Sequence, residues 1–237
     1  MSADGTRGPG MSRTAFEMKR ALERVPTACP TCTFVDDGVR NHIDALFYER
    51  AVDVATRETI RAARGFCRHH ARLVSRHADA LGTALILRDV LINDLRDVEG
   101  GMYDRPAGKP GQFARFFDSK SGLSPRPPCP LCVVEGDIEL LATDNLLGGL
   151  GDAEFAAAFR RSDGLCIPHF RLAFERCQVQ AAWAIVLETE RPMLERITTE
   201  LEELARKYDY QSHEKPHGAE AGAWRRALNL TSREIDE

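Results

Sequence analysis

Two copies of one cysteine–histidine pattern stand out in the sequence. Each copy reads CPxC followed by GxCxxH, with 34 residues between Cys32 and Cys67 and 33 residues between Cys132 and Cys166. Six of the seven cysteines belong to these copies. Three thiols and one imidazole form a complete tetrahedral ligand set for zinc. The predicted ligands are Cys29, Cys32, Cys67 and His70 in the first copy and Cys129, Cys132, Cys166 and His169 in the second.

The number of ligands favours a structural role for the metal. Each predicted set fills four positions with protein atoms, whereas a catalytic zinc normally keeps one position for water or substrate. We therefore expect two zinc ions per chain, which add free energy to folding. A helical hairpin separates the two pairs of each copy, so we expect each set to close within its own copy. His69 adjoins His70, but only His70 matches the register of His169.

Two other metal chemistries fit the same residues. An iron–sulfur cluster also uses cysteines, although it takes histidine less often. Alternatively, the zinc thiolates are oxidisable, so that the protein is redox-active. The sequence contains no Walker loop, no GxSxG elbow and no HExxH motif, so we do not expect an enzyme. The favoured function is a zinc-binding protein that acts by binding another protein.

An arginine series suggests a second alternative, a nucleic-acid-binding module. The series could form a basic stripe if the local helices are collinear. No aromatic residues interleave with it, and acids such as Asp89, Asp94 and Asp97 are available to pair with it. Nucleic acid is therefore not the expected partner. The candidate residues are Arg57, Arg61, Arg64, Arg68 and Arg72.

Helical patterns surround every predicted ligand, and strand patterns are absent from the sequence. Pro30 and Pro130 suit the first turn of a helix. Asp53 and Asp152 are predicted helix caps, and Gly65 and Gly164 are predicted helix stops. The fold class is therefore all-α, with duplicated helical hairpins, pseudo-twofold halves and a long C-terminal helix. Pro192 is expected to kink that helix or to begin another one.

The register of the two copies indicates an internal duplication. Cys29 and Cys129 are 100 positions apart, whereas the capping aspartates and the CxxH residues are 99 positions apart. We predict five segments from this register and from composition. They are a disordered N-terminus at 1–12, a first metal-binding repeat at 13–99, a Gly/Pro/Ser-rich linker at 100–128, a second metal-binding repeat at 129–209, and a tail at 210–237 whose short helix docks through Trp224.

Composition limits the cellular compartment and the kinds of partner that we expect. The chain has 237 residues, 43% of them hydrophobic, with a net charge of −4 and a pI of about 6.0. No signal peptide and no transmembrane stretch is recognisable, and Met11 is a candidate alternative start. Free cysteines with ligand spacing suit a reducing compartment. We therefore predict a cytoplasmic protein that does not bind membranes.

Several motifs together resemble an uncharacterised prokaryotic family of unknown function. The resemblance extends over nearly the whole chain after Met11. It implies a helical protein with two Cys/His clusters and no established activity. Besides the two CPxC…GxCxxH halves, it rests on Phe47-Tyr48-Glu49-Arg50, on Ser162-Asp163-Gly164-Leu165-Cys166, and on Tyr208-Asp209-Tyr210 with Ala223-Trp224-Arg225-Arg226-Ala227-Leu228.

Overall fold

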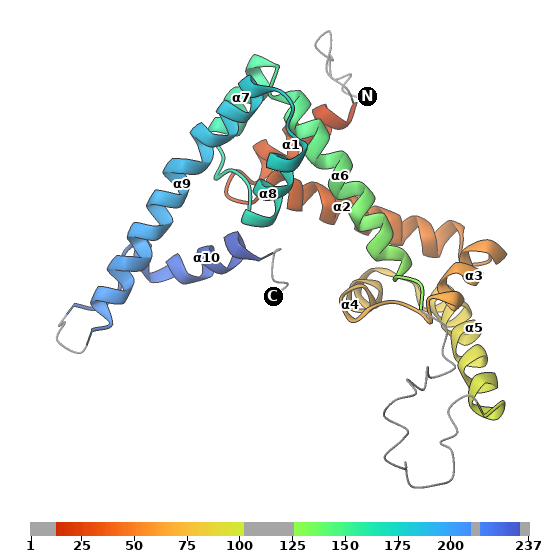
Figure 1. Ribbon diagram of the computed structural model, residues 1–237. Coiled ribbons are helices and arrows are strands. Elements are labelled where there is room, and N and C mark those ends of the chain that lie inside the picture. Colours follow the sequence, from red (N-terminus) through yellow and green to blue (C-terminus); the bar gives the residue numbers. More distant parts are fainter. Residues whose placement is uncertain (1–12, 102–125, 210–213, 233–237) are drawn as a thin grey trace, which may run out of the picture. The chain divides into compact units, whose positions relative to one another are not determined.

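The computed structural model describes residues 13–101, 126–209 and 214–232, and these residues form helices without strands. The all-α prediction is therefore confirmed for the described residues. The predicted disordered N-terminus, the candidate start at Met11 and most of the predicted linker lie outside them. The elements are α1 (Arg13–Arg24), α2 (Pro30–Glu49), α3 (Val54–Ala62), α4 (Arg68–His77), α5 (Ala80–Glu99), α6 (Pro130–Gly149), α7 (Ala153–Arg160), α8 (Ile167–Arg176), α9 (Gln180–Lys207), η2 (Ala219–Gly222) and α10 (Ala223–Thr231) (Figure 1).

The predicted helix boundaries follow local chemistry. Asp53 and Asp152 cap α3 and α7, because each carboxylate accepts a hydrogen bond from the backbone N–H three residues later. Gly65 and Gly164 adopt φ values of 90° and 75°, which favour glycine. These turns place the CxxH motifs at the starts of α4 and α8. Pro192 lies inside α9, which continues through it as one helix.

The chain divides into two compact units that do not coincide with the two sequence copies. Unit 1 contains the described residues up to Asp37 and from Asp137 onward, and unit 2 contains Gly38–Gly136. The boundaries fall inside α2 and α6. Each unit therefore includes the first turn of one long helix together with the CxxH motif of the other sequence copy.

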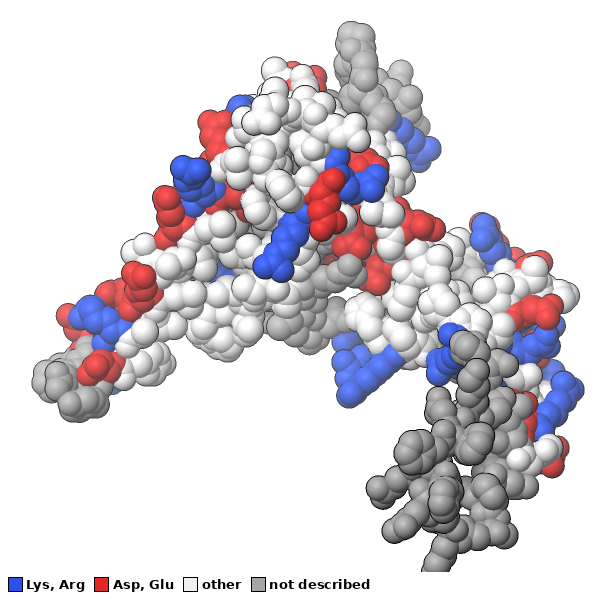
Figure 2. Space-filling view, viewed as in Figure 1, with Lys and Arg blue, Asp and Glu red and all other residues white. Residues whose placement is uncertain are grey.

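Unit 1 is built around α9. Helix α7 packs on α1 and α9, and α10 packs on α8 and α9 (Figure 1). The fully buried side chains include Met18, Phe155, Phe159 and Val186. The tail docks through Ala223, which is fully buried, whereas Trp224 is 46% exposed, so the predicted docking through Trp224 is wrong. Acidic and basic side chains are interspersed along the outer side of α9 (Figure 2).

Unit 2 packs α3 against α5. Ile43, Ile60 and Ile86 are almost fully buried in this unit. Asp79 caps α5 by accepting hydrogen bonds from the backbone N–H groups of Leu81 and Gly82 at 2.8 and 2.9 Å. The cap separates α4 from α5, and α5 begins directly after Asp79.

Candidate metal centres

Site 1 lies in unit 1 and joins the start of α2 to the start of α8. Cys29 immediately precedes α2 and Cys32 lies in its first turn, while Cys166 caps α8 and His169 lies in the first turn of α8. The His169 Nδ1 atom is 3.1 Å from the Cys166 sulfur. It is 3.3 Å from the Cys32 sulfur and 3.4 Å from the Cys29 sulfur. Four potential ligand atoms therefore converge in one place.

Site 2 repeats this arrangement in unit 2, at the starts of α6 and α4. The His70 Nδ1 atom lies 3.2 Å from the sulfur of Cys67, 3.4 Å from that of Cys132 and 3.8 Å from that of Cys129. The Cys67 side chain also accepts a hydrogen bond from the His70 backbone N–H, which caps α4. His70 is buried, whereas Cys132 is exposed. The solvent therefore reaches one thiol of this site.

The separations between these atoms suit a tetrahedral zinc ion. Zinc–sulfur bonds of about 2.3 Å and zinc–nitrogen bonds of about 2.0–2.1 Å imply ligand-to-ligand separations of about 3.5–3.8 Å. The sulfur of Cys32 is 3.7 Å from that of Cys166, and the sulfur of Cys132 is 3.6 Å from that of Cys67. Both sets could therefore hold a metal ion without rearrangement of the helices.

Each set of four ligands combines one pair from each sequence copy, so the predicted closure within one copy is wrong. The CPxC pair of the first copy meets the CxxH pair of the second, and the converse holds at the other site. The two helices between these motifs are unequal in length: α2 has 20 residues and is about 30 Å long, whereas α3 has 9 residues and is about 13 Å long.

Glutamates of α6 lie beside both imidazoles. The His169 Nε2 atom lies 3.0 Å from Glu139 Oε1, and the His70 Nε2 atom lies 3.7 Å from Glu135 Oε2. A metal-binding histidine commonly donates its second ring N–H to a carboxylate, which fixes the tautomer and the ring orientation. In both sites Nδ1 is accordingly the nitrogen that faces the three sulfurs and could bind a metal. These glutamates were not identified in the sequence.

The ligand groups of the two sites would differ in charge when no metal is bound. In site 1, hydrogen bonds from Cys29 and Cys32 hold the pKa of the Cys166 thiol far below its ordinary value. Burial disfavours the charged form of His169, but hydrogen bonds with Cys166, Cys32 and Glu139 raise its pKa to about 11. Site 1 without metal therefore contains a thiolate beside an imidazolium.

Site 2 lacks this ion pair. Burial, together with the neighbouring charge of His69, lowers the pKa of His70 to about 4. Partial desolvation of its sulfur raises the pKa of Cys132 to about 12, together with a hydrogen bond to Cys67, although the residue as a whole is exposed. Its imidazole is therefore neutral at neutral pH. Binding of a metal requires thiolates and must release protons from either site.

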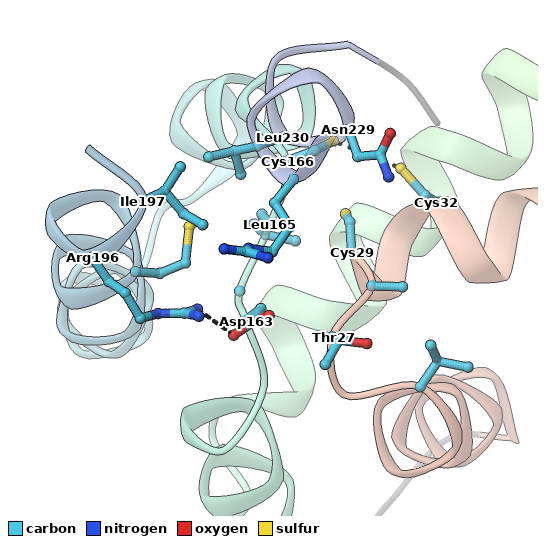
Figure 3. Close-up of a pocket in the computed structure, with 15 residues that line it drawn as sticks. Thr27, Cys29, Cys32, Asp163, Leu165, Cys166, Arg196, Ile197, Asn229 and Leu230 are labelled. Carbon is cyan, nitrogen blue, oxygen red and sulfur yellow. Dashed lines mark hydrogen bonds and ion pairs between the residues drawn. The ribbon is translucent and has the colours of Figure 1, made fainter. Parts of the chain in front are cut away.

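A cavity of about 270 Å³ adjoins site 1 (Figure 3). The ligand cysteines Cys29, Cys32 and Cys166 form part of its lining. Arg196 lies 2.7 Å from Asp163, and Figure 3 draws this contact as a dashed line. The guanidinium of Arg226 reaches Glu200. Because both arginines are paired with acids, the cavity has no strong preference for an anion. It gives small molecules a route to the sulfur atoms.

A buried glutamate supports the loop that leads into Cys166. Glu190 of α9 is 1% exposed and accepts a hydrogen bond from the Leu165 backbone N–H at 2.5 Å. Its second oxygen has no hydrogen-bond partner within the described residues. The carboxylate lies against Gly164, where a Cβ atom would collide with it. In the sequence, Glu190 lies in register with the apolar residues of α9, and this spacing is the signal from which its burial could have been predicted.

The remaining sequence candidates lie outside both sites. Cys177 directs its thiol to the Val179 carbonyl, so it belongs to neither ligand set. The predicted arginine stripe is divided between helices and largely paired. Arg57 lies 3.1 Å from Asp89, Arg61 lies 3.0 Å from Glu58, and Arg64 lies 2.6 Å from both Asp94 and Asp97, while Arg68 and Arg72 are exposed on α4.

Comparisons with known proteins give no activity. None of the helices in the described part of the chain combines the length and apolar character that a membrane crossing requires. No protein of curated description and no solved structure matches the chain. The model of one protein family, DUF6062, matches residues 17–237. The chain therefore belongs to this family, whose function is unknown.

Proposed function

We propose that this protein binds two structural zinc ions, one in each unit, and acts through a protein partner. The convergence of two Cys3His sets at tetrahedral separations carries the proposal. Each ion would join segments far apart in the sequence. Cys32 and Cys166 are 134 positions apart, and Cys67 and Cys132 are 65 positions apart. Since the unfolded chain does not hold these groups together, zinc binding would add free energy to folding.

The choice of zinc over a cluster rests on the ligand set. Each site supplies one imidazole whose outer nitrogen faces a carboxylate, an arrangement typical of zinc-bound histidine. The four protein ligands leave no position for substrate, which favours a structural role over hydrolysis. Two rigid helical units would then present surfaces to another protein.

Metal analysis of the purified chain tests the proposal. Protein purified without added metal should contain about two zinc ions per chain, and Cys67→Ser should contain one. Mass spectrometry after thiol alkylation should then show Cys129 and Cys132 newly labelled, with Cys29 and Cys32 still protected. Cys177→Ser, outside both sites, should keep both ions and both protected sets. Iron with inorganic sulfide, or less than one zinc ion per chain, would contradict the proposal.

Oxidisable zinc thiolates are the second candidate, because solvent reaches both sites. Cys132 is exposed, and a cavity borders the sulfurs of site 1. Hydrogen peroxide would oxidise two thiolates to one disulfide, be reduced to water, and release the zinc ion. Release of zinc by peroxide that a thiol reductant reverses would support this candidate. Retention of both ions under peroxide would exclude it.

A further inference from the structure

Helix α5 carries an exposed apolar stripe along its outer side. The stripe follows steps of three and four residues, which is the heptad spacing of a helix-pairing seam. Four of its members are large and apolar, and they are 55% to 72% exposed. We define the α5 stripe as Leu81, Ala84, Arg88, Leu91, Leu95 and Val98.

The fold of the helix does not require this apolar character, as α9 demonstrates. Residues 100 positions later along the chain are also exposed, so both helices turn the corresponding face outward. Their inner faces also correspond, since Ile86 and Val186 are both buried. Yet the outer positions of α9 are polar or small, in keeping with the charges visible along it in Figure 2. These positions are Ala181, Ala184, Glu188, Arg191, Glu195 and Thr198.

The spacing and length of the stripe suit a second helix of the same kind. Helix α5 has 20 residues, which corresponds to about 30 Å and nearly three heptads. Each leucine-sized side chain offers about 60–120 Å² of apolar surface. Leu91, Leu95 and Val98 from each of two copies would bury roughly 350–700 Å², which lies at the small end of weak, reversible interfaces.

The charges of α5 select an antiparallel arrangement of two copies. A parallel pair would place Arg88 against its own equivalent. An antiparallel pair with Leu91 opposite Leu95 places Arg88 level with Val98 and next to Glu99 of the other copy. Within the described residues no carboxylate pairs with Arg88, and its neighbour Asp89 is already bound by Arg57. Such a pair would thus join two arginines to two glutamates.

We propose that the α5 stripe is a homodimer interface, in which it packs antiparallel against the same stripe of a second copy. The interface is distinct from both metal centres, since none of its residues is a ligand. An interface this small belongs to the weak, reversible class, and we expect a dissociation constant on the order of 1–100 μM.

Sedimentation velocity of the zinc-loaded full chain over that concentration range tests the proposal. The wild type should shift from monomer to dimer, and Leu91→Glu with Leu95→Glu should raise the dissociation constant at least about 100-fold. Circular dichroism and zinc content of the double variant should match the wild type. Arg191→Glu, the corresponding change on the polar face of α9, should leave the dimer unchanged.

A charge exchange tests the orientation. Arg88→Glu alone should weaken the dimer, and adding Glu99→Arg should restore it, because the ion pair is re-formed with reversed sign. A wild type that stays monomeric would overturn the proposal, and so would a dimer that survives the Leu91 and Leu95 changes. A monomer that dimerises only after deletion within residues 104–123 would also overturn it, by assigning the stripe to that segment.

Discussion

Glu190→Gln should stabilise the protein, and the gain should increase with pH. Glu190 is almost fully buried, and only one of its oxygens accepts a hydrogen bond within the described residues. Burial raises the pKa of this carboxyl to about 8; the Leu165 hydrogen bond lowers it, whereas the charge of Cys166 adds to the rise. Glutamine keeps an acceptor for the Leu165 N–H and carries no charge at any pH.

The size of the gain follows from the two pKa values of the carboxyl. An unfolded glutamate has a pKa of about 4.3, so the folded state binds more protons between about pH 4 and pH 8. Stability of the wild type therefore falls as pH rises through this window. At about 1.4 kcal/mol per pH unit, the cost at pH 7 is on the order of 3 kcal/mol. The buried NH2 group of glutamine reduces the net gain to about 1–2 kcal/mol.

Urea unfolding of the zinc-loaded chain between about pH 5 and pH 8 measures this effect. The difference in unfolding free energy between Glu190→Gln and the wild type cancels the pH dependence that zinc binding contributes to both. Glu195→Gln, an exposed change on the same helix, should show no such trend. A difference that stays constant over the pH range, or a glutamine variant that is less stable at pH 8 than at pH 5 relative to wild type, would refute the reasoning.

Two further substitutions test the supports of site 1. Gly164→Ala should lower the melting temperature more than Gly65→Ala: both impose backbone strain of about 1–3 kcal/mol, but the Cβ at 164 would lie 2.9 Å from Glu190 Cδ, whereas at 65 it would lie 3.9 Å from Val90 Cγ1. Equal losses would contradict the contact. Glu139→Gln should weaken zinc binding at site 1 about 10–100-fold in competition with a chromophoric chelator, because it alters the carboxylate beside His169. Unchanged affinity would remove Glu139 from the site.

Local chemistry made the elements and the ligands predictable. The caps at Asp53 and Asp152 depend only on hydrogen bonds to backbone N–H groups three residues later. The turns at Gly65 and Gly164 depend only on the positive φ that glycine adopts easily. The acids named beside the arginine series, Asp89, Asp94 and Asp97, are the ones that Arg57 and Arg64 bind. These interactions join neighbouring helices of one sequence copy, so a helical pattern was sufficient to find them.

Pairings between distant segments required information that motifs do not contain. Glu190 occupies a register otherwise filled by Val186, Met193 and Ile197, so its burial was visible in the spacing. What the spacing did not show is the partner, since Leu165 lies 25 positions away. The exchange of ligand pairs likewise joins cysteines 134 and 65 positions apart, and neither motif contains that information.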